Sequence, residues 1–221
     1  MNSSLLFCVF CFTTLSIKIC LADPDNLRDA CPTDPTGKDT IFINGLPCKN
    51  PATIIASDFK TSKLKNAGDT DNYARSSVTI VTAFDFPGLN TLGLSVARTD
   101  LDVDGIVLPH SHPRASEMMF VFEGVVLAGF VDTNSKLFQK VLKAGDVFLF
   151  PRGLLHYCLN FGYDPATVFS VLNSQNPGVV SINDASFEPK FDTINKLVRK
   201  LISVSDDNHI PNVTFQSFNN P

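Results

Sequence analysis

The feature that most constrains the fold is a series of short apolar runs that begins near Ser76. The runs are rich in β-branched and aromatic residues, and they lie at Val78–Phe84, Leu92–Val96, Met118–Phe122, Val125–Phe130, Val147–Phe150 and Thr167–Val171. Turn residues separate them, among them Pro87-Gly88, Asp104-Gly105 and Ala144-Gly145. Many short strands with turns between them, and no alternating helices, are typical of a sandwich or barrel. The sequence therefore predicts an all-β domain over residues 76–186.

The segments on either side of this domain have a different texture. Residues 23–75 are rich in Pro, Asp, Asn and Lys, which predicts an N-terminal arm of loops and brief strands. After Ser186 the apolar period becomes that of a helix, with one stripe formed by Ile194, Leu197, Val198, Leu201 and Ile202. We expect a C-terminal α-helical extension over residues 187–221, whose stripe packs either on its own barrel or on another subunit.

Residues 1–22 have the pattern of a secretory signal peptide. An apolar core runs from Leu5 to Leu15, and Cys20-Leu21-Ala22 offers small residues at the cleavage positions before Asp23. A membrane anchor is the alternative, but Lys18 interrupts the apolar run well short of the ~20 residues that span a bilayer. We therefore expect a secreted mature protein that keeps no membrane contact after cleavage.

Composition and charge narrow the class of partner. The chain is 44% hydrophobic and 18% charged, which fits one ordinary globular domain rather than a disordered or fibrous protein. Its formal net charge is −4, and no basic cluster occurs along the 221 residues. Because nucleic-acid binding needs a cationic footprint, we expect no nucleic-acid partner.

Cleavage would leave three cysteines, Cys31, Cys48 and Cys158. In an oxidising compartment Cys31 and Cys48 are a natural pair, because they close a short loop near the mature N-terminus. Such a bridge should stabilise the fold by about 3 kcal/mol in the chain-entropy model. Cys158 is then the odd thiol, and burial without reactivity is its ordinary explanation. Secretion would also make Asn212-Val213-Thr214 a usable glycosylation sequon at Asn212.

Three of the four histidines lie in two short motifs bordered by Gly or Pro turns. Side chains two residues apart share one face of a strand, so His110 and His112 can point at one centre. Glu117 lies five residues beyond His112, an odd offset, so the intervening residues must turn the chain and let Glu117 enter a neighbouring strand facing inward. His156 follows the Pro151-Arg152-Gly153 turn and begins the next strand.

Taken singly, each of these side chains has an ordinary explanation as a surface or interior polar residue. Together, His110, His112, Glu117 and His156 form a coherent coordination set, whereas His209 lies in a polar tail without such a context. Three imidazoles and one carboxylate suit Mn, Fe, Co, Ni or Zn, and the missing thiolate argues against a Cys-rich structural zinc. A six-coordinate ion would keep open positions for water or substrate. Ligand spacing does not separate manganese from iron.

At these residues the chain resembles the cupin superfamily, and within it the plant germins and germin-like proteins. The second cupin motif, G-x5-P-x-G-x2-H-x3-N, is met in full from Gly145 to Asn160. The first, G-x5-H-x-H-x4-E-x6-G, is met from His110 to Gly124, with Asp104 in place of its opening glycine. Further germin-like segments are Cys31…Cys48, Ala56-Ser-Asp-Phe59, Gly88-Leu-Asn-Thr-Leu-Gly93, Pro113-Arg-Ala-Ser-Glu117 and Leu172-Asn-Ser-Gln-Asn-Pro-Gly178. The resemblance covers nearly the whole mature chain.

The resemblance implies a single cupin jelly-roll β-barrel that binds manganese through the four matching residues, with iron or another divalent transition metal as the alternative. It also implies an N-terminal disulfide, secretion to the plant cell wall or apoplast, and a role in defence or cell-wall stress. The implied assembly is a homohexamer, a trimer of dimers locked by the C-terminal helices. That assembly favours the intersubunit explanation of the helical stripe.

Germins proper oxidise oxalate with oxygen, giving carbon dioxide and hydrogen peroxide, whereas other germin-like proteins have superoxide dismutase, nucleotide-sugar phosphodiesterase or no settled activity. Alignment to the oxalate-oxidising germins places Ala97 and Val107 where those enzymes carry two asparagines beside the metal, and Leu108 where proline is common. Each lost hydrogen bond to a buried charge costs about 1.5–3 kcal/mol. We therefore expect a manganese superoxide dismutase acting on small oxygen species or a small anion. The alternative is a non-enzymatic metal-binding wall or receptor-type protein, and oxalate oxidase ranks third.

Overall fold

The computed structural model describes residues 29–34, 36, 42–43 and 46–181. The signal peptide expected at residues 1–22, the helical extension expected at 187–221 and the sequon at Asn212 lie outside these residues. The described part of the chain holds no helix that is both long and apolar enough to cross a bilayer. It divides into two compact units, of which the first ends at Lys60 but also includes Phe86–Leu92. The second contains Thr61–Asp85 and the chain from Gly93 onward.

The first unit is a small assembly of turns held by a disulfide. Its elements are β1 (Phe42–Ile43), β2 (Leu46–Pro47) and the 3-10 helices η1 (Pro51–Thr53), η2 (Ala56–Phe59) and η3 (Pro87–Leu89). Cys31 and Cys48, 17 residues apart, form the disulfide that the sequence predicts. Asn90 donates a hydrogen bond from Nδ2 to Cys31 Sγ at 3.2 Å, so the segment 86–92 is attached to the bridge itself.

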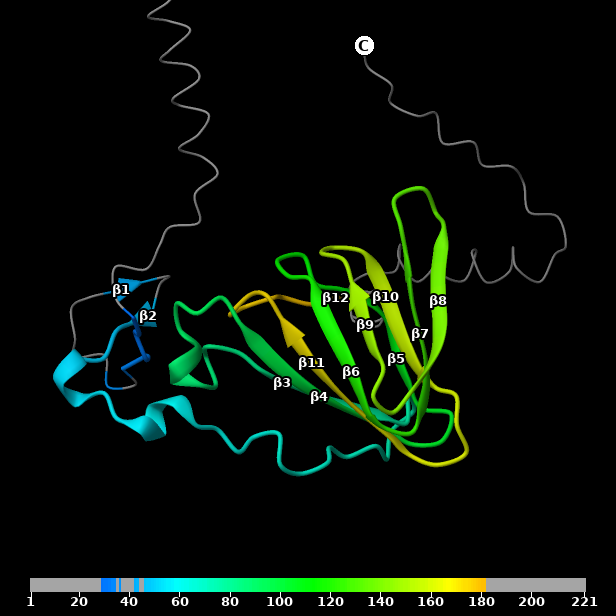
Figure 1. Cartoon of the computed structure of the whole chain (residues 1–221), viewed down its shortest axis with the longest axis horizontal. Coiled ribbons are helices and arrows are strands. Elements are labelled where there is room, and N and C mark those ends of the chain that lie inside the picture. The colour runs from blue at the N-terminus through cyan, green and yellow to red at the C-terminus, as the bar shows by residue number, and fades with distance from the viewer. Residues whose placement is uncertain (1–28, 35, 37–41, 44–45, 182–221) are drawn as a thin grey trace, which may run out of the picture. The chain divides into compact units, whose positions relative to one another are not determined.

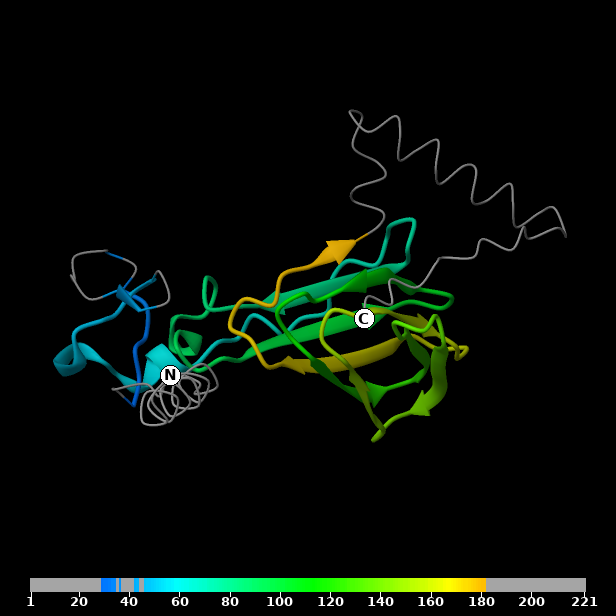
Figure 2. The ribbon, with the colours of Figure 1, turned by 90° about the horizontal axis from the view of Figure 1, so that it is seen from above.

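The second unit consists of two five-stranded antiparallel sheets (Figures 1 and 2). The first sheet has the order β12-β5-β10-β7-β8, with bounds Val180–Ser181, Ile106–Ser111, Leu155–Asn160, Val125–Val131 and Leu137–Lys143. The second has the order β3-β4-β11-β6-β9, with bounds Ser76–Val81, Ser95–Leu101, Ala166–Leu172, Glu117–Glu123 and Val147–Phe150. Strands distant in sequence are neighbours in both sheets, as in a jelly roll, and the predicted all-β fold is confirmed.

Strand β11 illustrates how the sequence fixes which side chains face the interior. Val168, Ser170 and Leu172 are buried on its inner face, whereas Val171 is exposed on the other. The strand pairs with β4 and β6 on its two sides, so a slip of one residue would turn the buried set outward. The core between the sheets draws on both of them and contains Leu101, Met119, Val121, Val126, Ala128, Leu142, Phe150, Cys158, Ala166 and Val168.

Most predicted runs coincide with strands, and the differences have simple causes. The run at Leu92–Val96 overlaps only the beginning of β4, because this strand starts at Ser95 and continues to Leu101 through the polar residues Arg98, Thr99 and Asp100. Strand β8 was not predicted, since six of its seven residues are exposed and its Lys-containing sequence lacks apolar alternation.

Candidate metal centre

The four predicted ligands come from three strand ends that belong to both sheets. His110 on β5 is paired directly opposite His156 on β10. His112 lies just past the end of β5, and the chain then crosses to the other sheet, where Glu117 opens β6. Glu117 therefore faces inward, as expected, but from the facing sheet instead of from a strand bonded to β5. Because residues 113–116 cross from one sheet to the other, the Glu117 carboxylate reaches the histidines although it lies an odd number of residues after His112.

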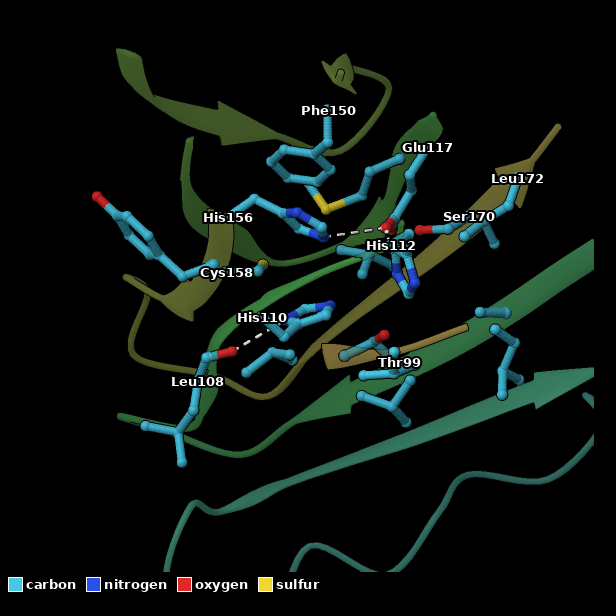
Figure 3. Close-up of a pocket in the computed structure, with 18 of the residues that line it drawn as sticks. Thr99, Leu108, His110, His112, Glu117, Phe150, His156, Cys158, Ser170 and Leu172 are labelled. Carbon is cyan, nitrogen blue, oxygen red and sulfur yellow. Dashed lines mark hydrogen bonds and ion pairs between the residues drawn. The ribbon is translucent and has the colours of Figure 1, made fainter. Parts of the chain in front are cut away.

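The donor atoms of these four residues converge on one point between the sheets (Figure 3). One nitrogen or oxygen atom from each lies within 4.8 Å of all the others. Glu117 Oε2 is 3.2 Å from His112 Nε2 and 3.3 Å from His156 Nε2. The rings of His110 and His156 have centroids 4.3 Å apart, and Phe150 stacks on the other face of His156 at 4.5 Å. Sequence spacing predicted this convergence.

Each imidazole is oriented by a backbone carbonyl on its Nδ1 side. The bonds join His110 to the Leu108 oxygen (2.9 Å), His156 to the Leu154 oxygen (2.9 Å) and His112 to the Gly178 oxygen (2.6 Å). A carbonyl oxygen can only accept, so Nδ1 carries the proton and Nε2 keeps its lone pair. All three histidines thus present a ligand atom to the centre, the arrangement that metal-binding histidines show.

The charges at the centre suit a cation. Burial lowers the pKa of His110 to about 4, with a further lowering from nearby His156, so this ring is neutral at pH 7. Burial would raise the pKa of the Glu117 carboxyl, but the side chains of His112, His156 and Ser170 together hold it well below its usual range. Burial would lower the pKa of His112, but the Glu117 carboxylate and the Gly178 carbonyl outweigh it and raise that pKa above its usual value. The result is an ionised carboxylate beside a neutral His110, in a centre whose carboxylate attracts positive charge.

One buried atom is a direct test of whether a metal fits here. Nε2 of His156 is buried and has no hydrogen-bond partner, although Glu117 Oε2 lies 3.3 Å away. An unsatisfied buried polar atom is costly, and a cation at the centre of the four donors would satisfy it. The donor set and the unpartnered nitrogen both fit a divalent transition metal.

The centre lies at one wall of a cavity of about 330 Å³. Its apolar lining includes Val78, Ile80, Ala97, Val107, Leu108, Met119, Phe150, Val168, Leu172 and Val179. Ala97 and Val107, which the alignment set at the positions of the two asparagines of oxalate-oxidising germins, therefore line the cavity. The hydroxyl side chains of the lining among the described residues are Thr99, Tyr157, Ser170 and Ser181. The cavity is therefore mostly apolar, apart from the four converging donors.

Several contributors to the centre were not singled out from the sequence. Ser170 donates a hydrogen bond to Glu117, and the only signal for it is a polar residue at an inward position between Val168 and Leu172. The Gly178 carbonyl that holds His112 comes from a loop 66 residues further on. Every residue has a backbone carbonyl, so the sequence does not indicate which carbonyl accepts the hydrogen bond from His112.

The sequence of the chain matches a protein family and several known relatives. Residues 62–200 match the cupin family. Germin-like protein subfamily 3 member 4 of Arabidopsis thaliana is 63% identical over 176 residues, which cover 80% of this chain and 82% of that protein. The chain belongs to the germin-like cupins.

Solved structures agree with the germin-like assignment. Recombinant oxalate oxidase in complex with glycolate matches with a TM-score of 0.73 and 36% identity, covering 83% of this chain and 92% of that one. Peruvianin-I, described as a cysteine peptidase from Thevetia peruviana latex, matches with a TM-score of 0.66 and 42% identity, covering 72% and 98%. This germin-like protein therefore shares its fold with proteins of differing described activities, and its own chemistry has to be argued from its own site.

Proposed function

We propose that this germin-like protein binds one manganese ion through His110, His112, Glu117 and His156, and that it dismutates superoxide. The observation that carries the proposal is the set of four nitrogen and oxygen donors within 4.8 Å of one another at a cavity wall. Donors of this kind suit manganese and iron alike, and the likeness to germins favours manganese. When bound, such an ion would supply one-electron chemistry.

The residues around the centre have definable parts in such a reaction. Glu117 supplies a negative charge, and the three imidazoles, each held by a carbonyl at Nδ1, supply their Nε2 atoms as donors. The Nδ1 protons are engaged by those carbonyls, so the protons that convert two superoxide ions to oxygen and hydrogen peroxide must enter from solvent through the cavity. The walls are mostly apolar and carry a few hydroxyl groups, so a small ion can enter, and the four donors are the strongest binding groups that it meets there.

The same walls argue against oxalate as the substrate. A dianion buried beside the metal needs hydrogen-bond donors, because leaving its oxygens unpaired costs about 1–3 kcal/mol each or more. Ala97 and Val107 offer none at the positions where oxalate-oxidising germins carry asparagine. Superoxide needs an open coordination position but no such donors, so the loss need not affect its turnover.

Peruvianin-I is described as a cysteine peptidase, but the free thiol of this chain does not support the same activity here. Among the described residues the free cysteine is Cys158, which is buried at 6% exposure. Burial, assisted by the Glu117 charge, raises the pKa of its thiol to about 12. A nucleophilic cysteine needs the thiolate form, and although Cys158 lines the cavity, the raised pKa keeps its thiol protonated at neutral pH.

Elemental analysis and a superoxide assay on purified protein test the proposal. We expect manganese near one per subunit and dismutation that is lost in His156→Ala but kept in Glu123→Gln, an exposed change at the far end of β6. Equal dismutation by wild type and His156→Ala would refute the enzyme. If metal removal lowers the thermal midpoint while superoxide, oxalate and nucleotide sugars are not turned over, the non-enzymatic wall protein is the correct alternative.

We further propose secretion and self-association. The Cys31–Cys48 disulfide supports an oxidising compartment such as the apoplast. The outer face of the second sheet carries exposed apolar side chains in two paired rows, Met118, Phe120 and Phe122 on β6 and Val147 and Leu149 on β9. Such a patch suits a second copy of the chain in a trimer of dimers. Light scattering on Phe122→Glu/Leu149→Glu should give smaller particles than wild type, and an unchanged mass would count against this face.

A further inference from the structure

Arg114 is exposed, yet it is bonded at several points to a loop that comes much later in the chain. Its backbone N–H donates to the Pro177 carbonyl at 3.1 Å. Its guanidinium donates from Nε to the Asn176 carbonyl at 2.7 Å and from Nη2 to Asn176 Oδ1 at 3.1 Å. The fork of the arginine therefore spans main chain and side chain of one residue, which fixes both distance and orientation.

Two residues after Asn176 comes Gly178, whose backbone lies close to the guanidinium of Arg114. Its φ is +68°, and a Cβ built on it would lie 2.8 Å from Arg114 Nη2, so the loop packs flush against the guanidinium at a place only glycine fits. The Gly178 carbonyl accepts the 2.6 Å hydrogen bond from His112 Nδ1. The contacts thus run in sequence from Arg114 through Asn176 and Gly178 to His112.

We infer that Arg114 is a positioning residue for the metal centre: by clamping Asn176 and Gly178 it holds the carbonyl that keeps His112 Nε2 facing Glu117. It is neither one of the four donor residues nor one of the residues that line the cavity. The inference rests on the proposed metal site, and it concerns a residue that lies between two ligands of the first cupin motif without being one. Without the clamp, the loop could move and His112 could adopt the other tautomer or turn its ring.

Two simpler explanations predict different results. If Arg114 were an ordinary exposed arginine, its removal would leave metal binding unchanged. If it acted only through its charge, its removal would strengthen cation binding, because a positive charge near the site repels the metal. The clamp predicts the opposite sign, a weaker site. Arg152 is a matched control, since it is also exposed, lies in the turn just before His156, and shows no hydrogen bond or ion pair within the described residues.

Metal affinity and histidine tautomers measured side by side test the clamp. Wild type, Arg114→Ala, Arg114→Lys and Arg152→Ala would be titrated with Mn²⁺ against a competing chelator. We expect about tenfold weaker binding for both Arg114 variants, the effect typical of partners outside the ligand shell, because lysine keeps the charge but loses the fork. Arg152→Ala should bind as tightly as wild type or more tightly. Wild-type affinity in either Arg114 variant, or an equal loss in Arg152→Ala, would overturn the inference.

Nitrogen-15 NMR of the metal-free protein gives a readout that does not depend on the metal. His112 should be protonated at Nδ1 in wild type and become a tautomer mixture in Arg114→Ala, while His110 and His156 keep their signals. An unchanged His112 would overturn the clamp, even if wild type bound no metal and the proposed function had failed. If Arg114→Ala did not fold, Arg114→Lys would provide the same readout, because lysine keeps the charge and the length of the side chain but loses the fork. Unchanged affinity and unchanged His112 signals there would equally reject the inference.

Discussion

Glu117 and His112 are five residues apart in sequence but face each other from opposite sheets, with Oε2 of one 3.2 Å from Nε2 of the other. The crossover between them is therefore part of the site. It brings the Glu117 carboxylate, which belongs to one sheet, to the histidines of the other sheet. Asn173 supports it by accepting from the Ser116 N–H at 2.7 Å and donating back to the Ser116 oxygen at 3.2 Å. The centre is held by both sheets at once, so its geometry is coupled to the packing of the barrel.

Replacing Glu117 by Gln should weaken metal binding by more than about 100-fold, since changes outside the ligand shell alone cost about 10–100-fold. The variant keeps the size of the side chain but removes the negative charge that balances the cation. Elemental analysis after dialysis against a chelator measures the effect. Glu123→Gln makes the same change at the exposed end of β6 and should retain its metal. Full retention by Glu117→Gln would show that the carboxylate is not a ligand.

Substituting Ala97→Asn together with Val107→Asn should produce oxalate turnover above that of the wild type, for which we expect none. Both residues line the cavity, and the two amides would supply the donors that a bound dianion needs. Hydrogen peroxide release in the presence of oxalate is the measurement. Val96→Asn, on the opposite face of β4, is the matched control and should gain no activity. If the folded, metal-loaded double variant gains none either, these two positions do not determine whether oxalate is oxidised.

The four residues of the candidate metal site could be predicted from the sequence because their chemistry is rare and local. His110 and His112 share a strand face, so strand periodicity placed these two imidazoles near each other. His156 joined them because it follows a Pro-Gly turn in a second motif and completes a coherent donor set. Glu117 was harder, since its sheet depends on a crossover whose path the sequence does not specify. The Gly178 carbonyl and the Arg114 fork lie beyond sequence reasoning altogether, because tertiary contacts between distant loops decide them.

The fold was predicted where burial leaves an alternating pattern, and missed where it does not. Strands β6, β7, β9 and β11 coincide closely with apolar runs. The run expected at Leu92–Val96 ends before most of β4, which extends to Leu101. The strand can continue through polar residues because Arg98 and Asp100 form an ion pair on its outer face, and apolar patterning does not detect such a segment.

The Arg98–Asp100 pair should make stability fall in acid. Burial raises the pKa of the Asp100 carboxyl, but hydrogen bonds from Arg98, the Gly68 N–H and Thr167 outweigh it and leave the pKa below its usual value. The folded state therefore favours the carboxylate, so its contribution is fully present above about pH 4 and is lost as the pH falls through the lowered folded pKa. Asp100→Asn should cost about 1.5–3 kcal/mol at pH 7 and much less at pH 2–3, as measured by urea unfolding.

The exposed pair formed by Arg75 and Asp102 provides the comparison for that measurement. Asp102→Asn should change stability far less than Asp100→Asn, because solvent screens surface ion pairs. A difference between wild type and Asp100→Asn that stays constant from pH 7 to pH 2 would mean that the pair does not contribute through its charge.

Cys158 should resist alkylation in the folded protein. The thiol lies in the core on β10 with its pKa raised to about 12 by burial and by the Glu117 charge, so the reactive thiolate is scarce at neutral pH. Iodoacetamide on the chain beginning at Asp23 should modify nothing in native buffer and one cysteine in urea without reductant, because Cys31 and Cys48 are joined. Mass spectrometry identifies the labelled peptide. Rapid native labelling of Cys158 would show that the core next to the metal centre opens to solvent, and the exclusion of a thiol-based activity would have to be withdrawn.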